Sequence, residues 1–275
     1  MAILMERDID VSNEIDTLFR RYNKQPIDSD VGVIILKQQY IGCGGKEKSY
    51  DIKIWGKTVL EWVKLAFDTC PIMELDYREG VDVLNVIKPY LSDKKYTAVF
   101  FADTPLFRRE TFINILDYVQ TKRLNVCKLE RGYIFVTDYL RSVDKIYSTV
   151  YPAAIDKQEF EIAKDMRSIE SISKVLKDRI LNFHIEQGVQ FLDKSSVSID
   201  ADVVIGEGVV IHANNTIEGQ SVIGDNVVLY TGNIIVNSKI ANDSVLKYSV
   251  IEDSEINAGT EVPPFSHIQK GIVKR

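Results

Sequence analysis

The sequence predicts two dissimilar domains, an α/β domain with a mostly parallel sheet and then a left-handed parallel β-helix of about four coils. Three observations lead to this prediction. Apolar, β-rich runs alternate with helical patterns in the first half, an amphipathic helical pattern follows, and aliphatic residues then recur at every sixth position. Strand–helix alternation is typical of α/β sheets, and a six-residue period is typical of a β-helix.

The predicted α/β domain covers residues 31–150. The expected strands are VGVIIL (31–36), YTAVFFA (96–102) and RGYIFVTDYL (131–140), and the expected helices cover 58–69, 81–91 and 108–120. In parallel sheets of this kind, ligands bind at the carboxyl ends of strands, and Asp103 directly follows one of the apolar runs. The carboxylate of Asp103 is therefore expected to be either a turn residue or a ligand for a cation.

Two helical segments flank this domain. Residues 1–30 are expected to form a helical extension, because VSNEIDTLFRRYN reads as a helix with Ser12 as its cap. Residues 151–187 are expected to form a linker that contains one helix, near 157–182. Gly188 is the residue expected to end the helical pattern. The apolar stripe of this helix, at helical spacing, consists of Ile169, Ile172, Leu176, Ile180 and Phe183.

The β-helix is predicted over residues 188–275. Its inward positions, six residues apart, are Ile199, Ile205, Ile211, Ile217, Ile223, Leu229 and Ile235. A second run keeps the same step after a slip of three residues, at Val250, Ile256, Val262 and Ile268. The slip is interpreted as a bulge or small loop at one corner. At 18 residues a turn, the repeats give about four coils.

Composition excludes several classes of protein. A hydrophobic content of 45% and a charged content of 27% are ordinary for a globular protein. The net charge of −6 argues against nucleic-acid or membrane partners, and no apolar run has the length of a membrane helix or the pattern of a signal peptide. The cysteines, Cys43, Cys70 and Cys127, are too far apart for a zinc motif. A cytoplasmic protein with reduced thiols is expected.

The order of these domains, together with three motifs, resembles the sugar-1-phosphate nucleotidyltransferase family with a hexapeptide-repeat C-terminus. The motifs are IWGKTVLEWVKLAF (54–67), FADTPL (101–106) and GVQFLDKSSVSIDADVVIGEGVVI (188–211). The likeness is greatest to the bifunctional N-acetylglucosamine-1-phosphate uridylyltransferase/glucosamine-1-phosphate acetyltransferase, of which the chain looks like a divergent, truncated relative. The resemblance implies a nucleotidyltransferase-like, Rossmann-like α/β domain of the UDP-N-acetylglucosamine pyrophosphorylase type.

The resemblance also implies a magnesium cofactor, since Asp103 matches the family's metal-binding aspartate. The family's second ligand is an asparagine, and Glu130 in KLERGYIF (128–135) stands in its place. Carboxylate oxygens suit Mg²⁺, so both residues are predicted metal ligands. A nucleotide and a sugar phosphate are the implied ligands, and a homo-oligomer, most commonly a trimer, is the implied assembly.

The phosphate-binding loop departs from the family pattern. The strand is followed by KQQYIGCGGKEKS (37–49), in which the glycines come late and the family's Thr-Arg pair is missing. The residues nonetheless predicted for phosphate or nucleotide binding are Gly42, Gly44, Gly45 and Gly80, and those predicted to supply the catalytic lysine are Lys46 and Lys48. Between Asp103 and Glu130, moreover, the chain is much shorter than the family segment that builds the walls of the sugar pocket.

Two functions remain open at this stage. The first is a reduced nucleotidyltransferase that still forms a sugar nucleotide with Mg²⁺, with either an intact or a degraded active site. The second is a non-catalytic relative that binds a nucleotide, a sugar phosphate or a protein partner as a scaffold or regulator. Acetyl transfer is not expected, because about four coils are too few and His212 and His267 read as corner or surface residues. The nucleobase, the sugar and any protein partner are left open.

Overall fold

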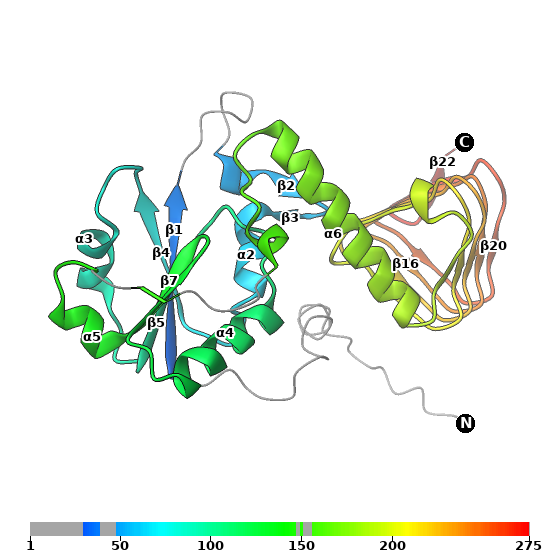
Figure 1. Cartoon of the computed structure of the whole chain (residues 1–275). Coiled ribbons are helices and arrows are strands. Elements are labelled where there is room, and N and C mark those ends of the chain that lie inside the picture. Colours follow the sequence, from blue (N-terminus) through cyan, green and yellow to red (C-terminus); the bar gives the residue numbers. More distant parts are fainter. Residues whose placement is uncertain (1–29, 39–47, 147–148, 151–155, 275) are drawn as a thin grey trace. The chain divides into compact units, whose positions relative to one another are not determined.

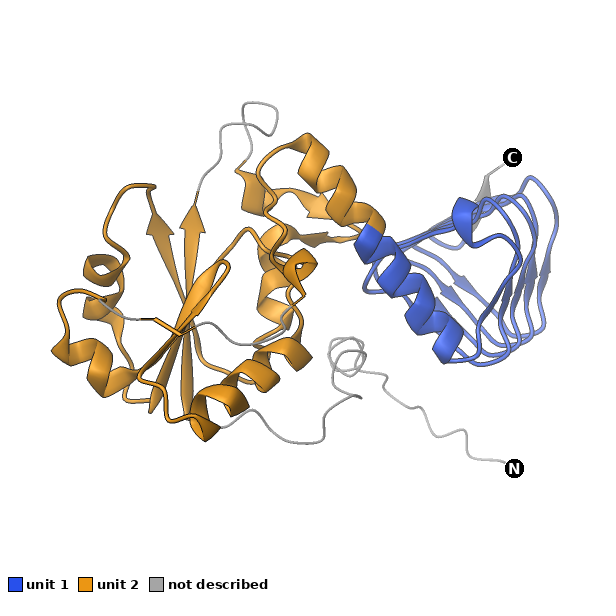
Figure 2. Cartoon of the chain, in the orientation of Figure 1, with its two compact units in different colours: residues 1–18, 175–275 blue, residues 19–174 orange. Residues whose placement is uncertain are grey.

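The computed structural model describes residues 30–38, 48–146, 149–150 and 156–274 (Figure 1). The predicted helical extension therefore lies outside the described residues, apart from Asp30. The described chain divides into two compact units, residues 30–174 and residues 175–274 (Figure 2).

The first unit is built on a five-stranded sheet with the order β4-β1-β5-β7-β6. Its strands are β1 (Val31–Gln38), β4 (Ile72–Tyr77), β5 (Tyr96–Phe101), β6 (Val126–Leu129) and β7 (Gly132–Val136). β1 runs parallel to β4 and β5, as predicted, whereas β7 is antiparallel to β5 and β6 is antiparallel to β7. The sheet is mostly parallel, as predicted, since β4, β1, β5 and β6 run in one direction and β7 runs against them. A tight hairpin at Glu130 and Arg131 joins β6 to β7, and two strands joined this way must be antiparallel.

Helices cover both faces of this sheet (Figure 1). They are α2 (Val59–Leu65), α3 (Val83–Ile87), α4 (Arg109–Thr121) and α5 (Thr137–Ser142). On one face α2 and α4 pack over an aromatic core that includes Phe67, Phe100 and Phe112. On the other, α3 and α5 pack over a core that includes Phe101. Strands buried on both faces are expected to be continuously apolar, which explains the VGVIIL and YTAVFF runs.

Short elements complete the first unit. A hairpin of β2 (Lys53–Ile54) and β3 (Lys57–Thr58) leads into α2, and Thr58 and Glu61 form a capping box at its start. The remaining short elements are 3₁₀ helices at Ser49–Asp51, Lys88–Tyr90 and Lys157–Phe160.

The helix α6 (Met166–Glu186) begins later than the sequence predicted, since residues 157–160 form a separate 3₁₀ turn. Asp165 and Ser168 determine where α6 starts. The Ser168 amide donates to Asp165 Oδ1 at 2.8 Å, and the Asp165 amide donates to Ser168 Oγ at 3.1 Å. These bonds satisfy two amides at the helix start, and the Ser168 amide holds the pKa of Asp165 below its usual value.

The second unit contains a left-handed β-helix. Its strands are β8 (Gln190–Phe191), β9 (Ser198–Ile199), β10 (Val204–Ile205), β11 (Val210–Ile211), β12 (Thr216–Glu218), β13 (Val222–Ile223), β14 (Val228–Leu229), β15 (Ile234–Val236), β16 (Lys239–Ile240), β17 (Val245–Leu246), β18 (Val250–Glu252), β19 (Glu255–Ile256), β20 (Glu261–Val262), β21 (His267–Gln269) and β22 (Ile272–Lys274). Three parallel sheets run along it, with orders β10-β13-β16-β19, β8-β11-β14-β17-β20 and β9-β12-β15-β18-β21, and β22 adds antiparallel to β21. Four complete coils, from β9 to β20, agree with the prediction.

The six-residue aliphatic series forms the core of this unit, since all seven predicted positions from Ile199 to Ile235 are buried. The second predicted series is partly wrong. Ile251, not Val250, points inward, and it pairs with Ile235 in the neighbouring coil. No single bulge causes the slip: the inward residues after Ile235 are Ile240, Leu246, Ile251 and Ile256, so three of the steps are five residues long.

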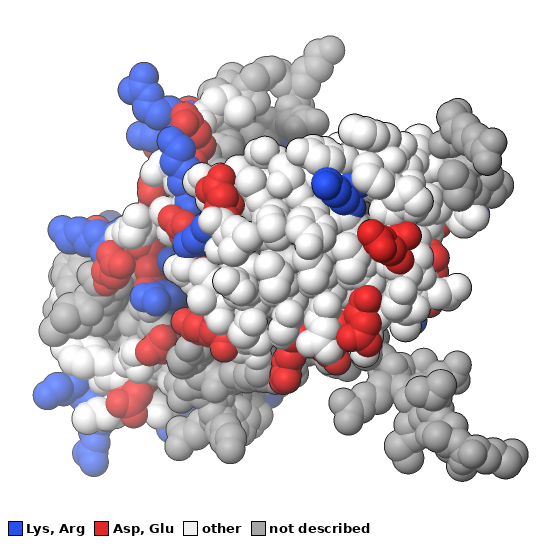
Figure 3. Space-filling view, turned by 90° about the vertical axis from the view of Figure 1, so that its right-hand side faces the viewer, with Lys and Arg blue, Asp and Glu red and all other residues white. Residues whose placement is uncertain are grey.

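Charge is sparse on part of this unit. On the face of the β-helix turned to the viewer in Figure 3, uncharged side chains predominate and most of the charged ones are acidic. Several large apolar side chains are exposed on the unit, namely Leu192, Tyr230, Ile234, Tyr248 and Phe265. Among the described helices, none is both long and apolar enough to cross a membrane.

Candidate functional site

Asp103 lies at the carboxyl end of β5, where the sequence predicted it. Its side chain is 1% exposed, which is unusual for a carboxylate unless a partner neutralises its charge. The backbone is fixed as well, because the carbonyl oxygen of Asp103 accepts a hydrogen bond of 2.8 Å from the amide of Ala163. This bond brings the segment just before α6 against the end of β5.

Arg131 is the partner of Asp103. Its Nε donates to Asp103 Oδ1 at 3.3 Å, and its Nη2 donates to Asp103 Oδ2 at 2.6 Å. Nη2 also donates, at 2.8 Å, to Oε1 of Gln38, which is the last residue of β1. A planar guanidinium matches a carboxylate in this two-point arrangement, and it keeps its charge at every physiological pH.

Two neighbours hold Arg131 in place. The guanidinium carbon lies 3.8 Å from the centroid of the Phe101 ring, which is within the range for a cation–π contact. The next residue, Gly132, has a φ of +141°, and a Cβ on it would lie 2.4 Å from the carbonyl oxygen of Val99. Only glycine lets β7 begin this close to β5, so the start of β7 fixes the direction from which Arg131 reaches Asp103.

The second predicted metal ligand, Glu130, is an exposed residue of the hairpin between β6 and β7. Its side chain is 51% exposed, and its Oε1 lies 4.0 Å from Nζ of Lys157, itself 86% exposed. Asp103 is thus paired with Arg131, whereas Glu130 makes an exposed contact with a lysine. The roles of the two acids as metal ligands stay predictions. Within the described residues, no group of three or more His, Cys, Asp or Glu side chains is arranged to hold a metal ion.

The predicted phosphate-binding residues lie largely outside the described part of the chain. Gly42, Gly44, Gly45 and Lys46 belong to residues 39–47, about which the structure gives no description. Lys48 and Gly80 are within the described residues, and their roles in phosphate or nucleotide binding stay predictions.

Lys48 is exposed just before the Ser49–Asp51 turn, and its Nζ lies 5.5 Å from the centroid of the Tyr50 ring. Gly80 has a φ of +87° in the turn before α3, and no atom lies within 4 Å of the place of a Cβ.

A cavity of about 330 Å³ lies on the same sheet face as Arg131. Because side chains alternate along a strand, Arg131, Tyr133 and Phe135 point to one face of β7. Tyr133 and Phe135, whose ring centroids are 5.4 Å apart, line the cavity together with Asp82 and Lys145. Phe135 is buried beneath Tyr133, so Tyr133 and the charged groups are the side chains that a small polar ligand could contact here.

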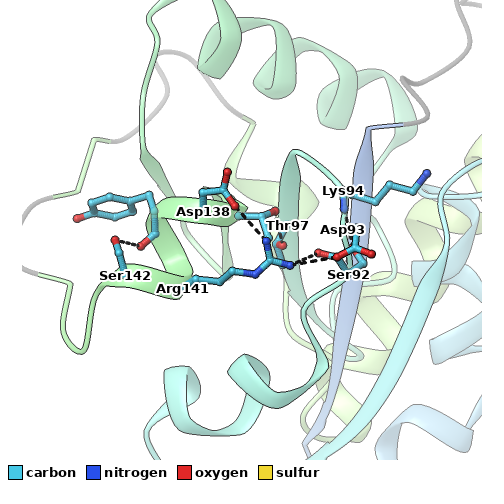
Figure 4. Close-up of polar contacts among 9 residues, drawn as sticks. Ser92, Asp93, Lys94, Thr97, Asp138, Arg141 and Ser142 are labelled. Carbon is cyan, nitrogen blue, oxygen red and sulfur yellow. Dashed lines mark hydrogen bonds and ion pairs between the residues drawn. The ribbon is translucent and has the colours of Figure 1, made fainter.

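A second polar cluster lies at the amino end of β5, away from Asp103 (Figure 4). Arg141 of α5 donates to the carbonyl oxygen of Ser92 at 2.9 Å and to Asp138 Oδ1 at 3.0 Å. Arg141 and both acids near it, Asp93 and Asp138, are exposed. Exposed pairs of this kind contribute little, so the cluster only attaches α5 to the loop before β5.

The described cysteines do not form a reactive site. Cys70 and Cys127 are both buried and free. Burial raises the pKa of each thiol to about 11, so both stay protonated near neutral pH. Neither is therefore a candidate nucleophile.

The sequence reasoning missed Arg131 and Gln38. A signal for Gln38 was available, because it follows the end of the first apolar strand in the same way as Asp103 follows the strand at 96–102. Arg131 had only an indirect signal, as the neighbour of the predicted ligand Glu130. Its contact with Asp103 depends on the antiparallel pairing of β7 with β5, which the sequence analysis did not predict.

Comparison with known proteins finds that the chain is similar to proteins named bifunctional protein GlmU, whereas no protein-family model matches it. The relative from Enterococcus faecalis is 34% identical over 142 residues, which cover 50% of this chain and 31% of the relative. The relative from Clostridium botulinum is 31% identical over 140 residues, which cover 31% of its own length. The relative from Lactobacillus delbrueckii is 33% identical over 147 residues, which cover 32% of its own length. The chain thus spans about a third of the length of the relatives that it matches. It is a divergent relative of the bifunctional GlmU proteins.

Proposed function

We propose that this chain is a non-catalytic member of the sugar-1-phosphate nucleotidyltransferase group, and that its α/β unit binds a nucleotide or a sugar phosphate without joining the two. The observation that carries the proposal is the pairing of Asp103 with Arg131. The carboxylate at the carboxyl end of β5 is already neutralised by a cation of the chain itself. The relatives support the link to nucleotidyltransferases, and this pairing supports the absence of turnover.

Nucleotidyl transfer needs a divalent cation to offset the charge that develops on the phosphates. The residues present do not fit Mg²⁺ well. An ion on Asp103 would approach the Arg131 guanidinium, and at about 4 Å with an effective dielectric of about 20 the repulsion between charges of +2 and +1 is roughly 8 kcal/mol. This repulsion and the loss of the Arg131 hydrogen bonds both oppose the binding of Mg²⁺ to Asp103. Glu130, half exposed beside Lys157, supplies no compensating second ligand at this position.

The segment between Asp103 and Glu130 supports the same conclusion. It consists of a turn, α4 and the four-residue strand β6. The resemblance stated above implies that a longer segment here forms the walls of a sugar pocket. A single helix that packs its apolar side on the sheet leaves little chain for such walls. The cavity beside Tyr133 and Phe135 remains as a place for one small ligand.

The alternative is an active nucleotidyltransferase in which Asp103 and Glu130 bind Mg²⁺ and Lys48 or Lys46 contacts the phosphates. The position of Asp103 at the end of β5 favours this reading. Two measurements separate the functions. Calorimetric titration with nucleoside triphosphates and sugar phosphates, with and without Mg²⁺, tests binding, and pyrophosphate release from UTP with N-acetylglucosamine-1-phosphate and Mg²⁺ tests turnover.

The proposal expects saturable binding of at least one ligand and no pyrophosphate above the level of a protein-free control. Turnover that Asp103→Asn abolishes would replace the proposal with the alternative. If none of the ligands binds and there is no turnover, the binding proposal fails. The hypothesis to test is then that the chain serves as a scaffold for a protein partner.

We also propose that the β-helix unit assembles as a homo-oligomer, most simply a trimer. The exposed rings of Tyr248 and Phe265, which stack with their centroids 5.8 Å apart, support this, because water-exposed apolar surface is stabilised by burial against a copy. Sedimentation at several concentrations tests the assembly. A monomer mass throughout the micromolar range would contradict it.

A further inference from the structure

We propose that Arg131 serves as a built-in cation at the position where a divalent metal would bind Asp103, so that the α/β unit is independent of metal. The inference concerns the same site and rests on the proposed function in one respect, the expectation that no metal-dependent step takes place there. The role of the Arg131 side chain is a separate question, which the ligand-binding experiments do not test.

Arg131 makes several hydrogen bonds of good geometry at this position. Two donors of Arg131 contact the two oxygens of Asp103, and one of these donors also contacts Gln38 Oε1. Asp103 is 1% exposed, whereas the Arg131 side chain is 20% exposed. The carboxylate is therefore almost fully buried, and both of its oxygens are already bonded to the guanidinium. A cation that took the place of Arg131 would have to break these hydrogen bonds.

Arg131 is also held in this position by groups other than Asp103. The Phe101 ring lies under the guanidinium at 3.8 Å, and β7 begins in contact with β5 at Gly132 and Val99. An arginine in an incidental contact with an acid would lack this contact with an aromatic ring and this fixed backbone. The side chain is thus pre-organised for this carboxylate, and its displacement loses the contact with Phe101 as well as the hydrogen bonds.

The charge of Arg131 suits the buried carboxylate. A guanidinium does not lose its proton and carries one fixed positive charge. It satisfies a buried carboxylate at all working pH values, as a metal ion does, and it needs no supply of ions. If Arg131 is removed, the same carboxylate is left buried without its partner, and a divalent cation becomes the ready substitute.

The test uses the full chain without nucleotide, so that it is separate from the ligand experiments. Thermal unfolding is followed in MgCl₂ and in KCl of equal ionic strength, for the wild type, Arg131→Ala, Asp103→Asn and the double variant. We expect Mg²⁺ to leave the midpoint of the wild type unchanged. In Arg131→Ala, which melts earlier, we expect the midpoint to rise with Mg²⁺ concentration, as a ligand that binds only the folded state requires. The double variant, which lacks the carboxylate, should again be insensitive.

Two results would overturn the proposal. In the first, Mg²⁺ raises the midpoint of the wild type and Asp103→Asn removes the effect, so that Asp103 binds metal in the presence of Arg131. In the second, folded Arg131→Ala does not respond, so that the guanidinium does not stand at a cation position. If Arg131→Ala does not fold, Mn²⁺ binding by electron paramagnetic resonance decides the matter with the wild type and Arg131→Lys. The wild type and Arg131→Lys should both leave Mn²⁺ unbound. A signal from protein-bound Mn²⁺ that Asp103→Asn abolishes would overturn the proposal.

Discussion

Both carboxylate oxygens of Asp103 accept hydrogen bonds from one guanidinium, that of Arg131. The acid comes from the end of a parallel strand, and the base comes from the hairpin that starts the neighbouring antiparallel strand. The sheet topology thus brings together two residues that are 28 positions apart. The stability of the α/β unit should depend on this contact.

The first prediction concerns the removal of one partner. Arg131→Ala should lower the free energy of unfolding of the α/β unit by roughly 3–5 kcal/mol, because it leaves the buried Asp103 carboxylate without its charge partner. The double variant Asp103→Asn/Arg131→Ala should lose less than the sum of the two single variants. Urea denaturation followed by the fluorescence of the unit's tryptophans, Trp55 and Trp62, measures both. Additive losses would mean that the two side chains are not coupled.

The second prediction concerns the backbone next to Arg131. Gly132→Ala should destabilise the α/β unit by more than about 2 kcal/mol, because the new Cβ would meet the backbone oxygen of Val99 and φ would be strained. Gly80→Ala is the matched control: its φ is also positive, at +87°, but no atom lies within 4 Å, so strain alone should cost about 1 kcal/mol. Equal losses for the two variants would show that the contact with Val99 is unimportant.

The third prediction concerns pH and His184. Burial lowers the pKa of this histidine to about 4, from an ordinary value of 6.5. Above pH 6.5 the side chain is neutral in both folded and unfolded chains and has no effect on the pH dependence. As the pH falls from 6.5 to about 4, only the unfolded chain takes up the proton, so the stability of the β-helix unit should fall by up to about 3 kcal/mol.

His184→Leu should remove most of this acid-induced loss. The control is His267→Gln, which changes a partly exposed histidine paired with Glu252 at 3.0 Å and should leave the loss in place. Urea midpoints at pH 7 and pH 5 measure the effect, with circular dichroism as the signal. If the wild type and His184→Leu lose equal stability on acidification, the buried histidine is not the cause.

The fourth prediction concerns a buried corner of the β-helix. Asn233 Nδ2 donates to Asn215 Oδ1 at 2.9 Å, and the Ser249 amide donates to Asn233 Oδ1 at 3.1 Å, so three coils are linked. Asn233→Leu should cost roughly 1–3 kcal/mol for each buried polar group that it leaves unpaired. Asn233→Ser should cost less, because the next coil carries a serine at this place. Thermal unfolding of the two variants measures the difference, and a smaller loss for leucine would contradict the account.

The sequence predicted most of the β-helix, because its pattern is local and repeated. Each inward residue is determined by a period that six neighbouring repeats share. The error at Val250 arose where several steps shorten from six residues to five, since valine and isoleucine at adjacent positions fit the pattern equally well. Only the pairing of Ile251 with Ile235 distinguishes them.

The candidate site was harder to predict. Asp103 was found because the end of a parallel strand is a known position for ligands. Its partner was not, because Gln38, Asp103 and Arg131 lie at or beside the ends of three different strands, and Gln38 and Arg131 are 93 positions apart. Such contacts depend on strand order and direction. The short strand β6 gave no apolar run long enough to be recognised, so the antiparallel hairpin that positions Arg131 was missed.

The measurement that tests the central claim most directly is an X-ray structure of the full chain from crystals soaked in Mn²⁺, with data collected to record the anomalous signal of manganese. The account predicts electron density for the Arg131 guanidinium on both oxygens of Asp103 and no anomalous peak at that carboxylate. An anomalous peak bonded to Asp103, with Arg131 turned away and Glu130 brought in as a second ligand, would contradict it.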